Sequence, residues 1–196
     1  MANLDRLREN LKARGFAYQY FKTGTEATAY LNRKLDATEI GIGGSKTVEE
    51  LGLYTTLATH NQVYWHHAGG EITDANHAPV YISSLNALAE TGELINIDGS
   101  GNRVAATVYG AKRVYFVVGI NKLTPDYDSA LFRARNIAAP KNAQRLGVKT
   151  PCAAKGDHCY DCKSPDRICR ALLVLWGKPK SAEETEVIVI GEELGF

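Results

Sequence analysis

Cysteine is absent from most of this sequence. The chain of 196 residues has four cysteines, and all four fall between residues 152 and 169. Long apolar runs are absent as well, since the longest, such as residues 171–176, are far too short to span a bilayer. We also find no N-terminal targeting pattern, so we expect a protein of the reducing cytoplasm with no membrane partner.

No excess of either charge sign is present. Lys and Arg together number 23, Asp and Glu number 22, and the formal net charge is +1. Proteins that bind nucleic acid usually carry a basic surplus, so we expect no nucleic-acid partner. Internal repeats and low-complexity segments are also missing. A hydrophobic content of 44% over 196 residues is enough for one core and little for two, which predicts a single domain over residues 1–196.

The cysteines that are present form one compact pattern, C-x6-C-x2-C-x6-C. A C-x2-C core lets two thiolates reach one metal atom with little backbone strain. Two structural disulfides would suit a short secreted domain better than this chain, and four unligated thiols are the other alternative without a metal. We interpret residues 150–170 as a metal or iron–sulfur segment. Its expected ligands are Cys152, Cys159, Cys162 and Cys169.

Spacing alone does not choose between zinc and an iron–sulfur cluster. A zinc ribbon has two C-x2-C pairs, and the bacterial ferredoxin run has spacings of two and three where this chain has six. Pro151 favours an extended backbone before it, which predicts that a loop presents Cys152. The run S-P-D at 164–166 is typical of a helix start, so we expect Cys169 about one turn into a helix.

Helical and extended patterns alternate along the chain. Helical patterns cover residues 4–14, 23–35, 84–90, 104–109 and 126–139, the last ended by Pro140. Extended patterns cover residues 17–21, 39–42, 62–65, 80–83, 93–97 and 113–118, and a further strand pair, 171–176 and 186–190, follows the cysteine-rich loop. The alternation predicts an α/β fold with an open, mostly parallel sheet and flanking helices. Ligands of such sheets bind beyond the carboxyl ends of the strands.

Three loops that follow predicted strands carry polar or cationic side chains. They are residues 43–47, 98–103 and 119–122, and they converge on one edge if their strands are neighbours. The first loop matches neither the phosphate-binding G-x4-G-K loop nor G-x-G-x-x-G, and the alternative is a tight turn that needs glycine only for its backbone angles. The expected anion-binding residues are Gly43, Gly44, Ser45, Lys46, Thr47, Asn102, Arg103, Asn121 and Lys122.

Catalytic groups are harder to recognise than anion-binding groups. Asp98 is the loop carboxylate best placed to act as a base or nucleophile, and Glu90 is the second candidate. The alternative role for Asp98 is to cap the turn ahead of Gly99. We find no base paired with an orienting partner. We expect His66 and His67 in a loop or on the surface, because neighbouring side chains of an extended chain point to opposite sides.

Five motifs resemble those of the lactate-utilisation (LUD) domain family. They are G-I-G-G-S-K-T at 41–47, E-L-I-N-I-D-G-S-G-N-R-V-A-A at 93–106, G-I-N-K at 119–122, A-P-x-N-A-x-R-L at 139–146 and P-D-R-I-C at 165–169. The resemblance covers nearly the whole chain. It implies a fold similar to the group of ribose-5-phosphate isomerase, glucosamine-6-phosphate deaminase and CoA-transferase. Larger members are implicated in oxidising lactate with iron–sulfur partner proteins, so the resemblance favours a [4Fe–4S] cluster over zinc.

Two functions of different classes follow from these observations. In the first, the chain is an enzyme or redox-enzyme subunit acting on a small anionic metabolite such as a lactate-type hydroxy acid, a sugar phosphate or a CoA ester. Its partners would then include iron–sulfur redox proteins. In the second, it is a non-catalytic anion-binding or redox-sensing accessory module with a structural zinc site. A base held by an orienting partner would favour the first function.

Overall fold

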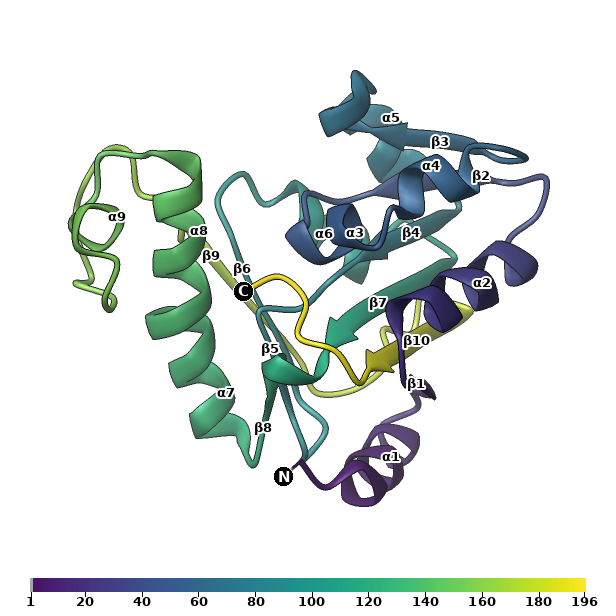
Figure 1. The fold of residues 1–196 in the computed structure, drawn as a ribbon, viewed down its shortest axis with the longest axis horizontal. Helices are drawn as coiled ribbons and strands as arrows, with labels where there is room; N and C mark the ends of the chain where they lie inside the picture. The colour runs from purple at the N-terminus through teal and green to yellow at the C-terminus, as the bar shows by residue number, and fades with distance from the viewer. Residues whose placement is uncertain (1) are drawn as a thin grey trace.

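The computed structural model describes residues 2–196 and consists of two sheets and the helices around them. Figure 1 shows the larger sheet on the right, the smaller sheet in the middle and a long helical segment on the left. The helical elements are α1 (Leu4–Ala13), α2 (Gly24–Lys34), α3 (Lys46–Glu50), α4 (Leu53–Leu57), η1 (His66–Ala68), α5 (Ile72–His77), α6 (Asn102–Val108), η2 (Ile120–Lys122), α7 (Tyr127–Arg133), η3 (Ala134–Ala138), α8 (Ala139–Leu146) and α9 (Pro151–Lys155). The strands are β1 (Ala17–Phe21), β2 (Glu39–Ile42), β3 (Gln62–Trp65), β4 (Val80–Ser83), β5 (Ala87–Ala89), β6 (Leu94–Asp98), β7 (Arg113–Gly119), β8 (Leu123–Thr124), β9 (Ala171–Leu175) and β10 (Glu184–Ile190).

The larger sheet is fully parallel. Its strand order is β1-β10-β7-β4-β2-β3, and every neighbouring pair runs in the same direction. The predicted α/β class with a mostly parallel sheet is therefore confirmed. Since β7, β4 and β2 are consecutive neighbours, the loops that follow them leave the sheet at one edge.

Both faces of the parallel sheet are covered, and the central strand β7 shows how. Its side chains alternate between the two faces, as the period of a strand requires. Phe116 packs in a core that includes Leu11 of α1, whereas the next residue, Val117, packs in a core that includes Leu31 of α2. All four side chains are fully buried, and burial of such a side chain contributes about 1.5–3 kcal/mol.

The smaller sheet is mostly antiparallel, and two sequence predictions about its strands are wrong. Its order is β8-β5-β6-β9. The helix predicted over residues 84–90 is wrong, because Ala87, Leu88 and Ala89 are fully buried as strand β5, which pairs with β6 and β8. The two C-terminal strands do not pair with each other, since β9 pairs with β6 while β10 pairs with β1 and β7. Strand β6 belongs to this second sheet, so the loop after it, residues 98–103, approaches the loops of the parallel sheet from a different sheet.

Pro140 does not end a helix, contrary to the sequence prediction. Elements α7, η3 and α8 run on as one helical segment, and η3 between them is π-helical. Pro140 lies in the first turn of α8, where the missing N–H costs least. The wider π-helical turn just before it changes the hydrogen-bond register. That change lets the segment continue past the proline.

None of the helices formed by residues 2–196 combines the length and the apolar character that a bilayer crossing requires.

Candidate functional site

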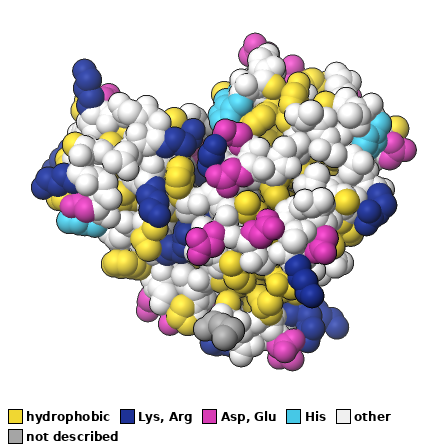
Figure 2. Space-filling model, in the orientation of Figure 1, with side chains coloured by type: hydrophobic (Ala, Val, Ile, Leu, Met, Phe, Trp, Pro, Cys, Tyr) yellow, Lys and Arg dark blue, Asp and Glu magenta, His cyan; other side chains and the backbone are white. Residues whose placement is uncertain are grey.

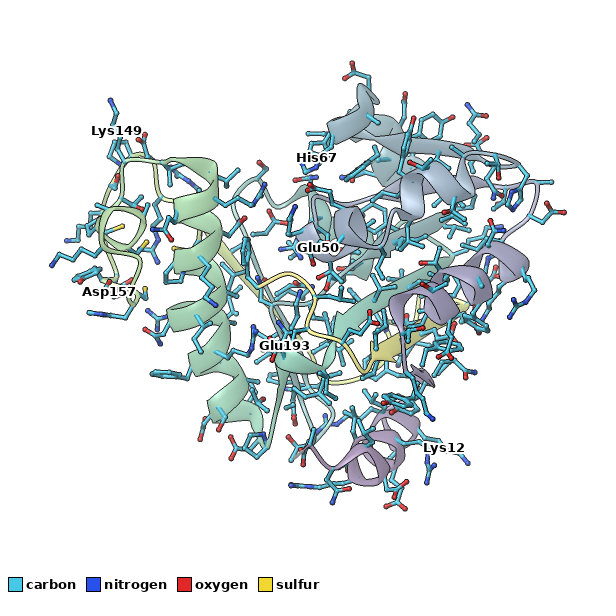
Figure 3. The ribbon with its side chains drawn as sticks, viewed as in Figure 1. Lys12, Glu50, His67, Lys149, Asp157 and Glu193 are labelled. Atoms are coloured by element: carbon cyan, nitrogen blue, oxygen red, sulfur yellow. The ribbon has the colours of Figure 1, made fainter. Side chains whose placement is uncertain are left out.

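A cavity of about 320 Å³ lies at the carboxyl edge of the parallel sheet. Figure 2 shows this face of the molecule hollowed by a notch, with Lys or Arg, Asp or Glu and His side chains along its sides. Figure 3 places His67 and Glu50 on the α3–α5 side of that notch and Asp157 well away from it, beside α9. Seven of the predicted residues line the cavity: Gly44, Ser45, Lys46, Asp98, Asn102, Arg103 and Lys122.

The loop after β2 contributes a cation that already has an ion-pair partner. Ser45 is the N-cap of α3, and its Oγ accepts a hydrogen bond from the Val48 N–H over 3.3 Å. Lys46 Nζ donates to Glu49 Oε1 over 2.8 Å, and this hydrogen bond lowers the pKa of Glu49. Helix α3 has only five residues, so its dipole contributes little. The cationic contribution of this loop to the cavity is therefore the Lys46 ammonium.

Lys122 is the most deeply buried amine in the cavity wall, with 4% of its surface exposed. Its Nζ lies 2.7 Å from Thr47 Oγ1 and 3.1 Å from Ser84 Oγ. Burial, followed by the nearby charges of Arg133 and Arg103, lowers the pKa of Lys122 to about 7, against an opposing effect of Glu50. A lysine at such a pKa is neutral in a large fraction of molecules near pH 7 and can act as a base or nucleophile.

Arg103 contributes a positive charge to the cavity but few free hydrogen-bond donors. Its Nη1 donates to Asn96 Oδ1 over 2.6 Å and to Ser84 O over 3.3 Å, and its Nη2 donates to Ile97 O over 2.7 Å. Its Nε lies 3.7 Å from Asp98 Oδ2. Most of the guanidinium is thus satisfied within the protein. A bound anion would be attracted by its charge with few new hydrogen bonds.

Asp98 lines the cavity, and both of its carboxylate oxygens hold the loop together. Oδ1 accepts from the Gly101 N–H over 3.3 Å, and Oδ2 accepts from the Val104 N–H over 3.1 Å in the first turn of α6. These are the contacts of a turn-capping residue. Gly99, the next residue, has no room for a side chain, because a Cβ there would lie 2.9 Å from Ile168 O.

The remaining predicted residues lie around the cavity or away from it. Thr47 is not a lining residue, but its Oγ1 accepts a hydrogen bond from Lys122, which is one. The backbone of Gly43 packs against Arg103, since a Cβ at Gly43 would lie 3.0 Å from Arg103 Cγ. Asn121 holds the C-terminal segment, because its Oδ1 accepts from the Leu194 N–H over 3.1 Å. Glu90 is not among the lining residues; its Oε1 accepts from the Asn3 N–H over 2.8 Å and fixes the start of α1.

Several lining residues were missed by sequence reasoning. His66 and His67 lie in a short turn after β3, with His67 exposed as expected, but they also line the cavity. They follow strand β3 at the same edge, so the rule that selected the other three loops would have found them. Burial, followed by the charges of His66 and Arg145, lowers the pKa of His67. Arg145 reaches the cavity from α8, and only the A-P-x-N-A-x-R-L motif in the sequence indicated it.

The four cysteines surround a second, smaller cavity. Cys152, Cys159, Cys162 and Cys169 all line it, all are half-buried, and all are free thiols. The four cysteines of the predicted segment are therefore neighbours around one cavity, and their role as metal ligands stays a prediction. Within the described residues, however, no three Cys, His, Asp or Glu side chains are already arranged to hold a metal ion. Ligation would therefore require the side chains to turn further toward one another.

The local structure of the cysteine segment differs from the prediction. Cys152 lies in helix α9, which Thr150 caps by accepting from the Ala153 N–H over 3.3 Å. The predicted helix after Ser164 is a single turn. Its end is fixed by Arg167, whose Nη1 donates to Cys162 O over 2.9 Å and whose Nε donates to Cys169 O over 2.8 Å. Thr-Pro and Ser-Pro give the same N-cap signal, and only the first of them forms a helix.

The two cavities share a wall. Ala139 of α8 and Ile168 of the cysteine segment line both of them. The segment is also bonded to the Asp98 loop, because the Arg170 N–H donates to Asp98 O over 2.9 Å. The thiol cavity and the cationic cavity are therefore adjacent.

Comparison with known proteins shows the family of this chain. The family model described as "LUD domain" matches residues 4–190. A crystal structure of a DUF162 family protein from Deinococcus radiodurans is similar in fold, with a TM-score of 0.56 and 14% sequence identity over 96% of each chain. No match was found among curated proteins. The chain belongs to the LUD domain family, the lactate-utilisation-related family that its motifs resemble.

Proposed function

We propose that this LUD-domain protein is an enzyme or redox-enzyme subunit that binds a small anionic metabolite, of the class of lactate-type hydroxy acids, in the 320 Å³ cavity. One observation carries the proposal. The cationic side chains of Lys46, Arg103 and Arg145, which come from three separate segments, line the same cavity. Cations gathered this way attract a carboxylate or phosphate, and charge-assisted hydrogen bonds to it contribute about 1.5–3 kcal/mol each.

The dimensions of the cavity favour a small ligand. Ligand pockets for drug-sized molecules span about 300–1,000 Å³, so this one is at the lower end of that range. A hydroxy acid or a small sugar phosphate fits within it. A CoA ester would have to extend most of its length outside, along the open side of the notch.

The cysteine segment supports a redox role. Four thiolates are the ligand set of a cubane [4Fe–4S] cluster as well as of structural zinc, and the four thiols here line one cavity. In the proposal they hold a [4Fe–4S] cluster, which supplies one-electron transfer when bound. Arg135 and Arg167 line the same cavity and would offset the negative charge of four thiolates. Iron–sulfur redox proteins are the expected partners.

Calorimetry on anaerobically purified protein tests the anion site directly. We expect saturable binding of lactate, or of another small anion among pyruvate, inorganic phosphate and a sugar phosphate. Lactamide is the matched neutral control, because it has the shape of lactate without the charge, and we expect no binding of it. If none of the anions binds, or if lactamide binds as well as lactate, the proposal is wrong.

The second candidate function is a non-catalytic anion-binding or redox-sensing module with structural zinc. The state of Asp98 favours it, since both oxygens of this lining carboxylate are occupied by backbone N–H groups. A base must therefore come from elsewhere in the cavity. Stoichiometric zinc in colourless, anaerobically prepared protein would support this alternative.

A further inference from the structure

Lys122 has an unusual set of contacts for a buried lysine. Its Nζ is bonded to two hydroxyl groups, Thr47 Oγ1 and Ser84 Oγ, and it takes part in none of the ion pairs formed by residues 2–196. The hydroxyls themselves form a chain, because Ser84 Oγ donates to Thr47 Oγ1 over 3.4 Å and Thr47 Oγ1 donates to Leu194 O over 3.2 Å. Two oriented hydroxyls thus fix an amine in the cavity wall.

The surroundings of Lys122 favour the neutral amine. Burial penalises the ammonium form, two arginines lie close enough to repel it, and no carboxylate bonds to it to compensate. Lys34 offers a contrast within the same chain. Burial also opposes the charge of Lys34, but Nζ is bonded to Glu184 and Glu186, each over 2.9 Å, and with these hydrogen bonds the pKa of Lys34 is raised. Lys34 is held as a cation, whereas the surroundings of Lys122 favour its neutral form.

We propose that Lys122 is a carbonyl-reactive amine that forms an imine with a small 2-oxo acid bound in the cavity. The inference rests on the proposed function, since it uses the same anion site. The carboxylate of the oxo acid is attracted by Lys46 and Arg145, which line that cavity. A neutral amine among cations is the arrangement that activates lysine toward carbonyl groups.

The step is balanced without any further reactant. The Lys122 nitrogen attacks the carbonyl carbon and opens the C=O bond to give a carbinolamine. The C–O bond then breaks, and the oxygen leaves as water with the two protons that the amine carried. The product is a C=N bond between Lys122 and the ligand. The hydroxyls of Thr47 and Ser84, which both contact Nζ, are placed to pass these protons.

Reductive trapping identifies the reacting amine. The whole protein is incubated with pyruvate and cyanoborohydride near pH 7, and the modified residue is located by peptide mass spectrometry. We expect a carboxyethyl group on Lys122, at a rate at least about tenfold above that of any exposed lysine. Lys122→Met should abolish this adduct, and Lys46→Met should keep it on Lys122 at reduced yield. Mapping the wild-type adduct needs no variant, so the test stands even if Lys122→Met fails to fold.

The outcomes separate this inference from the proposed function. Adducts spread evenly over exposed lysines, or none at all, in protein that binds pyruvate by calorimetry would overturn the imine and leave the anion site standing. Failure of every anion to bind would remove the anion site itself. Lactate supplies a second check, because it has no carbonyl group: it should bind competitively, slow the trapping by pyruvate, and form no adduct.

Discussion

Lys122 Nζ and Thr47 Oγ1 lie 2.7 Å apart although they follow strands β7 and β2, which are not neighbours in the sheet. Strand β4 lies between those two, and the segment that follows it supplies Ser84, the other oxygen that Lys122 contacts. One amine therefore ties together three consecutive strand ends. The same contacts position Lys122 for chemistry and hold the floor of the cavity.

The stability of the protein should depend on pH through Lys122. The pKa of Lys122 is 10.5 in the unfolded chain and about 7 in the folded one, so between these values the unfolded state binds more protons. The free energy of unfolding should therefore increase with pH in this window, by about 2 kcal/mol from pH 7 to pH 9 for this one group. Urea unfolding at both pH values measures the change.

Lys122→Met isolates that contribution, because other titrating groups are common to both proteins. The variant should lack the extra increase of about 2 kcal/mol between pH 7 and pH 9. Equal pH dependence of the two proteins would mean that Lys122 keeps an ordinary pKa in the folded state.

Lys46 should matter for anion affinity. Its ammonium lines the cavity, so Lys46→Ala should weaken binding of the small anion at least about tenfold, equivalent to roughly 1.4 kcal/mol. Calorimetry at fixed salt measures this, because screening alone can weaken exposed charges. Lys12→Ala is the control, since Lys12 is exposed on α1, far from the notch in Figure 3. Unchanged affinity in Lys46→Ala would remove this residue from the site.

Replacing Asp98 should lower the free energy of unfolding rather than remove a catalytic group. Asp98→Ala removes two hydrogen bonds to backbone N–H groups and the carboxylate beside the buried Arg103. Loss of such a cap costs about 1 kcal/mol, and an uncompensated buried charge adds to it. Urea unfolding should show the loss, whereas Asp36→Ala, at an exposed position, should change little. A fully stable Asp98→Ala protein that binds the anion and lacks activity would instead make Asp98 catalytic.

The cysteines should bind their metal as a set. Protein prepared under strict exclusion of oxygen should be brown, with iron and sulfide in the ratio of a [4Fe–4S] cluster. Replacing any one of the four cysteines, for example Cys162→Ser, should reduce the bound iron and the visible absorbance. Lys155→Ala, an exposed change in the same segment, should not. Stoichiometric zinc in place of iron would reverse the choice of metal.

The main features of the fold could be predicted because their signals are local. An unbroken β-branched and aromatic run such as the one around Phe116 indicates a strand that is buried on both faces. The loops that follow such strands indicate the edge at which ligands bind. The second sheet could not be foreseen, since Ala87 and Leu88 carry no strand signal of their own and become a strand only by pairing with β6 and β8. The helix that passes Pro140 depends in the same way on its π-helical turn.

The sequence indicated several residues that line the cavity, but it could not indicate their contacts. Lys46, Arg103 and Lys122 do line one cavity, but the sequence could not distinguish an arginine satisfied by carbonyl oxygens from a lysine bonded to two hydroxyls. That difference arises from contacts between segments far apart in the chain. The motif that contains Arg145 could not show that this residue reaches the cavity, because the position of α8 depends on packing between distant segments.

Ile168 couples the shapes of the two cavities. It forms part of both walls and is joined to Cys169 by a single peptide bond, while its carbonyl oxygen lies against Gly99 of the loop that carries Asp98. If Cys169 turned toward a metal, Ile168 would move with it, and the wall of the anion cavity would change. Filling or emptying the thiol cavity would then change the shape of the anion cavity, so the affinity for the anion would report on the state of the cysteines.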